Sequence, residues 1–447
     1  MKARLTVFLA ALAGFVSLAS FSFGQVVEFR ANITPGQETS TVVSGANGTA
    51  VMLYDVTANT FDLFVTLNNF TNPLTASHIH EAAAGVSGPV VTNFGAEAVY
   101  VRTGNTVTGV FRNVTHGGAR LTLLKNGAYL NFHTAAFPGG EIRGQLIAQP
   151  KRLSAIITAG QEVSTNPIAS NAFGGALMSY DPGTNRLLLQ VTLFNFTNTL
   201  TASHFHEAAA GANGPVVTNL GGASAYTVSA GFIQKNFELT YGGDPIKLLT
   251  AGAYLNFHSN VYGGGEIRGQ VRAADEVPSS RLINASSRGF AGTGSQVLIT
   301  GFAVVGDEPV AVRVIARGPS LSNYGVQGVL ADPTMTIHGS SGVLLAANDN
   351  HTLATPGVIP ALLNSKEAVV DLILPPGGYT AVVSGVGGAT GVALVEMFEQ
   401  RLGPDYNLAV TSLPQPGMSS MASTSRGQRV APEMCISPMV VATVGNR

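Results

Sequence analysis

Histidine is the residue whose spacing in this sequence points most directly to chemistry. Six of the nine histidines fall into two matching sets, each with a His-x-His pair and a later third member. Alternate residues of a β-strand point to the same face, so each pair can reach one metal ion. Three imidazoles with an open coordination position suit zinc or copper. The candidate ligands are therefore His78, His80 and His133 in one set, and His204, His206 and His258 in the other.

Both sets lie in a long internal repeat. The segment Thr75–Gly85 returns almost unchanged as Thr201–Gly211, an offset of 126 residues. The Ala-Tyr-Leu-Asn-Phe-His segment and the later Gly-Gly-Glu-Ile-Arg-Gly-Gln segment return at an offset of 125. Solenoid repeats have periods of roughly 20 to 50 residues, so each copy here should be a domain with its own core.

The composition predicts an all-β chain. It contains 53 glycines, no tryptophan and only 11% charged residues. Runs such as Phe61–Leu67 and Leu187–Leu193 alternate like strands between turn formers, and no stretch has convincing helical periodicity. Many short strands with glycine-rich turns predict two tandem Greek-key sandwich or barrel domains, with a superoxide-dismutase-like barrel as one form, followed by a third β-sandwich domain.

Several motifs in one order resemble the CHRD (chordin-type) domain of bacterial proteins. They are a Gln-Glu pair, the His-x-His with a following Gly-Pro-Val-Val, and the closing Asn-Phe-His and Gly-Gly-Glu-Ile-Arg-Gly. They occur twice and span about residues 26–272. The resemblance implies a binding role, because in animal chordin such domains sit in an extracellular growth-factor antagonist. It names no catalytic residue.

A second resemblance concerns the histidines. Copper/zinc superoxide dismutases carry a His-x-His strand and a late histidine before a glycine-rich final strand that contains arginine. This resemblance reaches His78, His80, His133 and their repeat partners, but the bridging histidine and zinc ligands have no counterpart, and Tyr241 replaces His116 in the second copy. A structural alternative stays open, in which the histidines only hydrogen-bond within a sheet. The pairs Glu141 with Arg143 and Glu266 with Arg268 are then expected to form ion pairs that close each barrel.

The N-terminus predicts export. Lys2 and Arg4 precede a short apolar run, and small residues stand before an expected cut after Gly24. Subtracting Lys2 and Arg4 from the 24 basic residues leaves 22 against 25 acidic ones, with no basic stripe for nucleic acid. Cys435 is the single cysteine, which excludes an intrachain disulfide. We expect a secreted, periplasmic or cell-surface product, without a transmembrane segment after cleavage.

The C-terminal third has a different pattern. Candidate strands alternate with turns from Arg281 to about Glu399, and the pattern is similar to sandwich domains at the ends of secreted bacterial proteins, including pre-peptidase C-terminal domains. The run Asn348-Asp349-Asn350 favours a turn over a calcium site because further carboxylates are missing. The expected layout is a signal peptide at 1–24, CHRD domains at 25–148 and 149–274, a sandwich at 275–403 and an irregular tail at 404–447.

These features support two hypotheses about function. The first is a non-enzymatic surface protein whose CHRD pair binds an extracellular protein, glycan or matrix component while the third domain spaces or anchors it. The second is a domain pair that binds copper or zinc through the two histidine sets, with a superoxide-dismutase-like redox enzyme as its weaker form.

Overall fold

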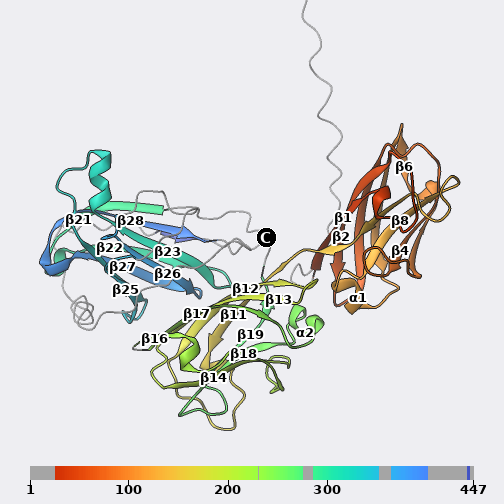
Figure 1. The fold of residues 1–447 in the computed structure, drawn as a ribbon. Helices are drawn as coiled ribbons and strands as arrows, with labels where there is room; N and C mark the ends of the chain where they lie inside the picture. The colour runs from red at the N-terminus through yellow and green to blue at the C-terminus, as the bar shows by residue number, and fades with distance from the viewer. Residues whose placement is uncertain (1–25, 230, 275–284, 352–363, 401–439, 443–447) are drawn as a thin grey trace, which may run out of the picture.

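The protein is built from β-sheets throughout the part that the computed structural model describes, residues 26–229, 231–274, 285–351, 364–400 and 440–442 (Figure 1). This confirms the predicted all-β class, with tandem β domains and a further β domain. The expected signal peptide, residues 275–284 at the start of the expected sandwich domain, and most of the expected tail lie outside these residues. Among the described residues, no helix has the length and apolarity needed to cross a membrane.

The first repeat is a sandwich of two antiparallel sheets with an apolar core between them. Residues such as Phe29, Leu63, Ile79 and Leu130 point inward and are fully buried. One sheet has the order β10-β1-β2-β3-β7-β6 and the other β5-β4-β8-β9. The elements are β1 (Val26–Ile33), η2 (Pro35–Gln37), β2 (Asn47–Asp55), β3 (Thr60–Asn68), β4 (Leu74–Glu81), β5 (Val90–Gly95), η3 (Glu97–Val99), β6 (Val101–Thr103), β7 (Thr106–Thr115), α1 (Arg120–Leu124), β8 (Ala128–Thr134), β9 (Ile142–Gln145) and β10 (Ile147–Ala148).

The second repeat has the same strands, but its two sheets are joined. Thr158 of β11 pairs with Arg268 of β19, whereas the matching contact in the first repeat, Thr34 with Arg143, is an isolated bridge. The elements are β11 (Lys151–Thr158), η4 (Ala159–Gln161), β12 (Phe173–Asp181), β13 (Arg186–Phe194), β14 (Leu200–His206), β15 (Val216–Asn219), η5 (Ala223–Ala225), β16 (Thr227–Ser229), β17 (Phe232–Thr240), α2 (Pro245–Leu249), β18 (Tyr254–Ser259), β19 (Ile267–Gln270) and β20 (Arg272–Ala273).

The third domain is a sandwich of the sheets β21-β28-β23-β26 and β25-β24-β27-β22-β29. Within the described residues, strands alternate with turns over the range expected from the sequence. At Asn348 the side-chain amide donates to the Asn350 carbonyl (3.2 Å) and accepts from the Val369 amide (2.9 Å). The elements are β21 (Ala285–Ala291), η6 (Gly294–Gln296), β22 (Leu298–Val304), β23 (Val310–Arg317), η7 (Pro319–Tyr324), β24 (Pro333–Gly339), β25 (Leu344–Asn348), β26 (Ala368–Leu374), β27 (Gly377–Gly385), η8 (Val386–Gly388), β28 (Gly391–Glu399) and β29 (Val440–Ala442).

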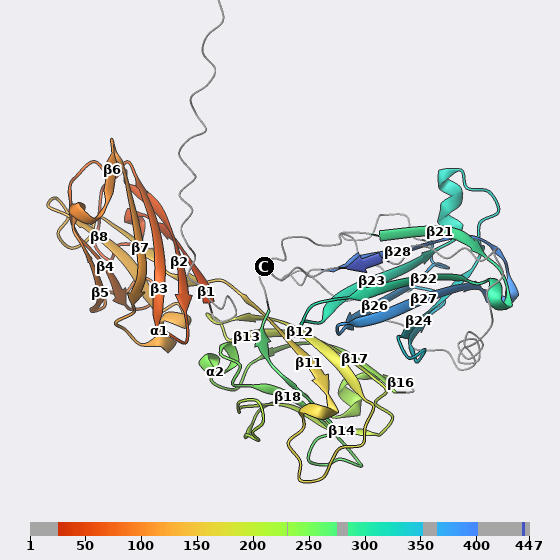
Figure 2. The same cartoon turned by 180° about the vertical axis from the view of Figure 1, so that it is seen from behind.

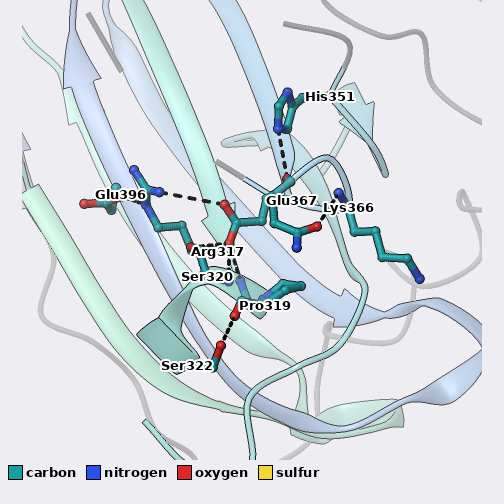
Figure 3. Close-up of polar contacts among 10 residues, drawn as sticks. Arg317, Pro319, Ser320, Ser322, His351, Lys366, Glu367 and Glu396 are labelled. Atoms are coloured by element: carbon teal, nitrogen blue, oxygen red, sulfur yellow. Dashed lines mark hydrogen bonds and ion pairs between the residues drawn. The ribbon is translucent and has the colours of Figure 1, made fainter. Parts of the chain in front are cut away.

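A buried carboxylate holds the η7 turn of this domain in place. Glu367 is fully buried, and its Oε1 accepts hydrogen bonds from the Gly318 amide (3.3 Å), the Ser320 amide (3.0 Å) and the Ser320 hydroxyl (Figure 3). Glu367 shares Arg317 with Glu396 of β28, and the Arg317 guanidinium lies 3.7 Å from Glu367. The group therefore ties three separate segments together.

The second repeat packs against the third domain through the outer face of its β12-β13-β17 sheet (Figures 1 and 2). Leu177 lies in a buried cluster with Ala311 and Ile373. Gln234 donates to the Asp371 carbonyl (3.0 Å), and Thr192 accepts from the Ile373 amide at 3.4 Å. In the first repeat, the position that corresponds to Leu177 is Val51, which is only half-buried.

These two positions form a matched pair for testing the contact. We expect Leu177→Ala to lower the free energy of unfolding by about 2–3 kcal/mol because it opens a cavity in a closed interface. Val51→Ala should cost less than about 1 kcal/mol because that face stays hydrated. Urea unfolding of the full chain measures both, and equal losses would contradict the packed interface.

Candidate metal centres

Strand geometry places the histidines of each set on the outer face of one sheet. In β4, Ser77 and Ile79 point into the core and are fully buried, so His78 and His80 point the other way. β8 pairs with β4 in a register that sets Ala76 opposite His133. The second repeat has the same register, with Ala202 opposite His258. The late histidine is thus a diagonal neighbour of the first histidine in each pair.

The three imidazoles of each set converge on one point. Each residue offers one ring nitrogen, and within each set these nitrogens all lie within 4.8 Å of one another. His78 Nδ1 is 3.2 Å from His133 Nε2, and His204 Nδ1 is 3.2 Å from His258 Nε2. Two nitrogens bound tetrahedrally at about 2.0–2.1 Å from zinc would lie roughly 3.3 Å apart. The first and third histidines of each set therefore already have the spacing of metal ligands.

Backbone carbonyls fix which ring nitrogen is free. His80 Nδ1 lies 2.9 Å from the Gly88 carbonyl and His133 Nδ1 lies 3.0 Å from the Pro138 carbonyl. A carbonyl only accepts hydrogen bonds, so each Nδ1 carries the proton and each Nε2 keeps its lone pair. Nε2 of His80 is buried and has no partner. Hydrogen bonds of this kind orient the histidine ligands of metal sites.

The second repeat reproduces this arrangement atom for atom. His206 Nδ1 donates to the Gly214 carbonyl (2.9 Å), and His258 Nδ1 donates to the Gly263 carbonyl (3.1 Å). His206 Nε2 is also buried without a partner. Gly263 occupies the position of Pro138 in the first repeat. The histidine therefore bonds to the backbone carbonyl at this position, and the identity of the side chain does not matter.

The surroundings favour the neutral form of the first and third imidazoles of each set. Burial lowers the pKa of His78, and the neighbouring His133 and His80 lower it further. Burial also lowers the pKa of His133, against the opposing effect of its bond to Pro138. The pKa values of His204 and His258 are lowered for the same first reason. Neutral rings bind metal without first losing a proton.

An aromatic stack supports the second histidine of each set. The His80 ring stacks on Tyr129 with centroids 4.9 Å apart, and the Arg143 guanidinium lies 3.3 Å from the Tyr129 centroid. The loop that carries Gly88 returns close to β4, where a Cβ on Gly88 would lie 1.9 Å from the Glu81 carbonyl oxygen. Only glycine fits at this position. The close approach of the loop places the Gly88 carbonyl where it accepts the hydrogen bond from His80.

The ion pairs expected between Glu141 and Arg143, and between Glu266 and Arg268, are wrong. Arg143 donates to the carbonyls of Ala83 and Val86, and Arg268 donates in the same way to Ala209 and Ala212. The glutamates instead accept from side chains on other segments, namely Ser44, Asn72 and Thr134 for Glu141, and Ser170 and Asn198 for Glu266. Spacing alone could not show that loops would supply better partners.

His116 lies apart from the first set. It is buried, both of its ring nitrogens lack partners, and its Nε2 is 3.8 Å from Glu81 Oε1. Burial lowers the pKa of His116 to about 4. In the second repeat the Tyr241 hydroxyl donates to Glu207 at 3.2 Å. At the position of His116, the second repeat therefore has a tyrosine that hydrogen-bonds to the neighbouring glutamate.

Sequence reasoning missed the residues that orient the histidines. Gly88 and Pro138 act through their carbonyls, Tyr129 and Arg143 act by stacking, and none is a ligand type. One signal was available, because Gly88, Tyr129 and Arg143 all recur in the repeated motifs as Gly214, Tyr254 and Arg268.

Comparison with known proteins gives one family. The model of the CHRD domain matches residues 29–146 and 153–271. No curated protein matches the chain. Among solved structures, the pre-peptidase C-terminal domain of a Bacillus anthracis collagenase is 15% identical over 26% of this chain and 90% of its own, with a TM-score of 0.17. A PNGF-II structure is 8% identical over 85% of this chain and all of its own (TM-score 0.16). At these TM-scores the two structures carry no argument.

His116 makes the stability of the first repeat depend on pH. Its folded pKa of about 4 lies below the 6.5 of an unfolded histidine, so the unfolded chain takes up the proton first. The stabilisation that neutral His116 gives the folded state is complete above pH 6.5 and is lost as pH falls toward 4. Between pH 7 and pH 5, urea unfolding should show wild type losing about 2 kcal/mol more than His116→Tyr, which has the residue of the second repeat. The same pH dependence in both proteins would refute this.

Proposed function

We propose that this chain, which belongs to the CHRD-domain family, is an exported protein that binds two transition-metal ions, one in each CHRD repeat. The observation that carries the proposal is the convergence of three imidazole nitrogens in each repeat, all within 4.8 Å. A purely structural role does not account for His80 Nε2 and His206 Nε2, which are buried without partners. An ion at the convergence point gives both of them a bond.

Zinc and copper are the ions that suit these ligands. Imidazole binds both well, and three nitrogen ligands leave a position open for a fourth ligand. The ligand atoms would be Nδ1 of His78 and Nε2 of His80 and His133. His78 Nδ1 faces His133 Nε2, so without an ion it donates to that nitrogen. Binding then requires His78 to carry its proton on Nε2 instead.

The role that we propose is binding rather than catalysis. Tandem CHRD domains support a binding or structural role in general. A copper/zinc dismutase needs a second metal beside the first, bridged by a histidine. Among the described residues, three or more ligand-type side chains converge only in the two histidine triplets, so neither triplet has a second such group beside it. His116, the remaining histidine of the first repeat, faces Glu81, and Tyr241 takes its place in the second.

The site of action that we propose is outside the cytoplasm. The predicted signal peptide at residues 1–24 supports export, and the third domain would space or anchor the repeats. Its sequence pattern, similar to C-terminal sandwich domains of secreted bacterial proteins, supports that role. The periplasm, the cell surface and the medium are all compatible with these features.

A second candidate function is recognition of an extracellular partner, and one observation favours a protein over a glycan or a matrix polymer. The outer face of the second repeat already binds a β-sheet, that of the third domain. The same face of the first repeat carries Val51, Phe64 and Val110, and Val110 is 58% exposed. Arg112 lies over the Phe64 ring on this face, 4.5 Å from its centroid, so a partner's sheet would pack against Val51, Val110 and this stacked pair.

Metal analysis of the mature chain, purified without chelating resin and dialysed against Zn²⁺ or Cu²⁺, tests the leading proposal. We expect two equivalents in wild type and one in His80→Ala or in His206→Ala, because each change removes a ligand from one repeat. His116→Tyr is the matched control and should keep two. Wild-type protein that takes up no metal, or triplet variants that keep both equivalents, would refute the proposal.

An array of extracellular proteins and glycans tests the second candidate. Phe64→Glu should abolish binding of a protein partner by charging the open face, while Val43→Glu, the same added charge in an exposed loop outside the sheet, leaves binding unchanged. If Phe64→Glu still binds the partner, this face is not the binding site.

A further inference from the structure

Each repeat has two further buried acceptors that lack partners, and an ion in the triplet would not itself pair with them. Asn131 is 4% exposed and its Oδ1 has no hydrogen-bond partner, and Oε1 of Glu38 is also buried without one. Buried acceptors that stay unpaired destabilise the folded protein. The two oxygens are neighbours, because the Cβ position of Gly140 lies 2.5 Å from Asn131 Oδ1 and 2.6 Å from Glu38 Oε1.

Asn131 lies beside the metal ligands. The β4–β8 register sets it opposite His78, and it precedes His133 by two residues on the same face. Glu38 is held above it by the preceding residue: Gln37 accepts from the Gln145 amide at 3.0 Å and donates to the Asn32 carbonyl. Gly140 has a positive φ of 128° and leaves the space that both acceptors occupy.

The second repeat has the same pair of acceptors. Asn256 Oδ1 and Glu162 Oε1 are buried without partners, and they lie 2.6 Å and 2.7 Å from the Cβ position of Gly265. The Asn256 side chain also hydrogen-bonds to the Glu162 carboxylate, and this bond opposes the effect of burial on the pKa of Glu162. Gln161 anchors the segment by accepting from the Gln270 amide at 3.1 Å. The repeated Gln-Glu, Asn-Phe-His and Gly-Gly-Glu-Ile-Arg motifs thus meet at the asparagine that neighbours each triplet.

We propose that Glu38 with Asn131, and Glu162 with Asn256, select the ion's fourth ligand, favouring water, which donates hydrogen bonds, and excluding small inorganic anions. Water gives the paired acceptors the donor that they lack. An anion brings no donor and meets the carboxylate. Arg143 does not offset this by binding the anion, because its guanidinium donates to Ala83, Val86 and Gln145. This inference rests on the proposed metal binding.

A proton shared between the two side chains is the competing explanation, and it requires no fourth ligand. Burial raises the pKa of Glu38 to about 7 against the opposing charge of Arg143, and burial raises that of Glu162 to about 7 as well. A carboxyl that keeps its proton to donate to the asparagine would have no negative charge with which to exclude anions. The two explanations therefore differ in how the site responds to an anion.

Azide titration of the Co²⁺-loaded full chain at pH 8, followed by visible absorption, tests the proposal. Glu38→Gln keeps the shape of the side chain and removes its charge. It should make one of the two Co²⁺ ions bind azide roughly tenfold more tightly, while the second repeat serves as an internal control. Glu162→Gln should do the same for the other ion. Glu28→Gln, the same charge change on the opposite sheet, should alter neither.

The outcomes separate this inference from the proposed function. Two bound Co²⁺ ions with equal azide affinity in wild type, Glu38→Gln and Glu162→Gln would overturn the ligand selection and leave the metal sites intact. Wild-type protein that takes up no Co²⁺ would overturn both. Because azide binding is measured at the Co²⁺ ion of each repeat, one variant is enough for the test if the other folds poorly.

Discussion

The candidate sites depend on two hydrogen bonds in each repeat, from the Nδ1 protons of the second and third histidines to backbone carbonyls. A neutral imidazole has one proton, so a carbonyl at Nδ1 leaves the lone pair on Nε2. In the first repeat the carbonyls belong to Gly88 and Pro138, which lie on loops that return to the sheet. The sheet sets the spacing of the rings, and the loops decide which atom each ring presents.

This dependence explains why the loops are held so firmly. The Arg143 guanidinium bonds the carbonyls of Ala83 and Val86 while it stacks on Tyr129, and the Tyr129 hydroxyl accepts from the Gly88 amide at 3.2 Å. One buried cation therefore positions both the loop and the ring beneath His80. Because Arg143 has these partners, it has no need of Glu141, which joins three other segments of the sandwich.

Periodicity in the sequence was enough to predict the strands and the histidine sets. Alternation in Ser77–His80 places two histidines on one face, and the internal repeat supplies the second copy of each ligand. The sequence could not predict interactions that pass through backbone atoms or through loops, such as the carbonyl of Gly88. It also gave no sign that Leu177 of the second repeat is covered by Ile373 while Val51 of the first is not. The Gln-Glu pair was visible as a motif, but its place over Asn131 depends on how Gln37 bonds to β9.

We propose that three defined nitrogens in each repeat bind one ion. A crystal structure of the Zn²⁺-loaded chain with anomalous data at the zinc edge tests it most directly. Two anomalous peaks are expected, the first about 2.0–2.1 Å from Nδ1 of His78 and Nε2 of His80 and His133, and the second at the matching atoms of His204, His206 and His258. Fully loaded crystals with zinc bound elsewhere, or with His78 Nδ1 still bonded to His133 Nε2, would contradict it.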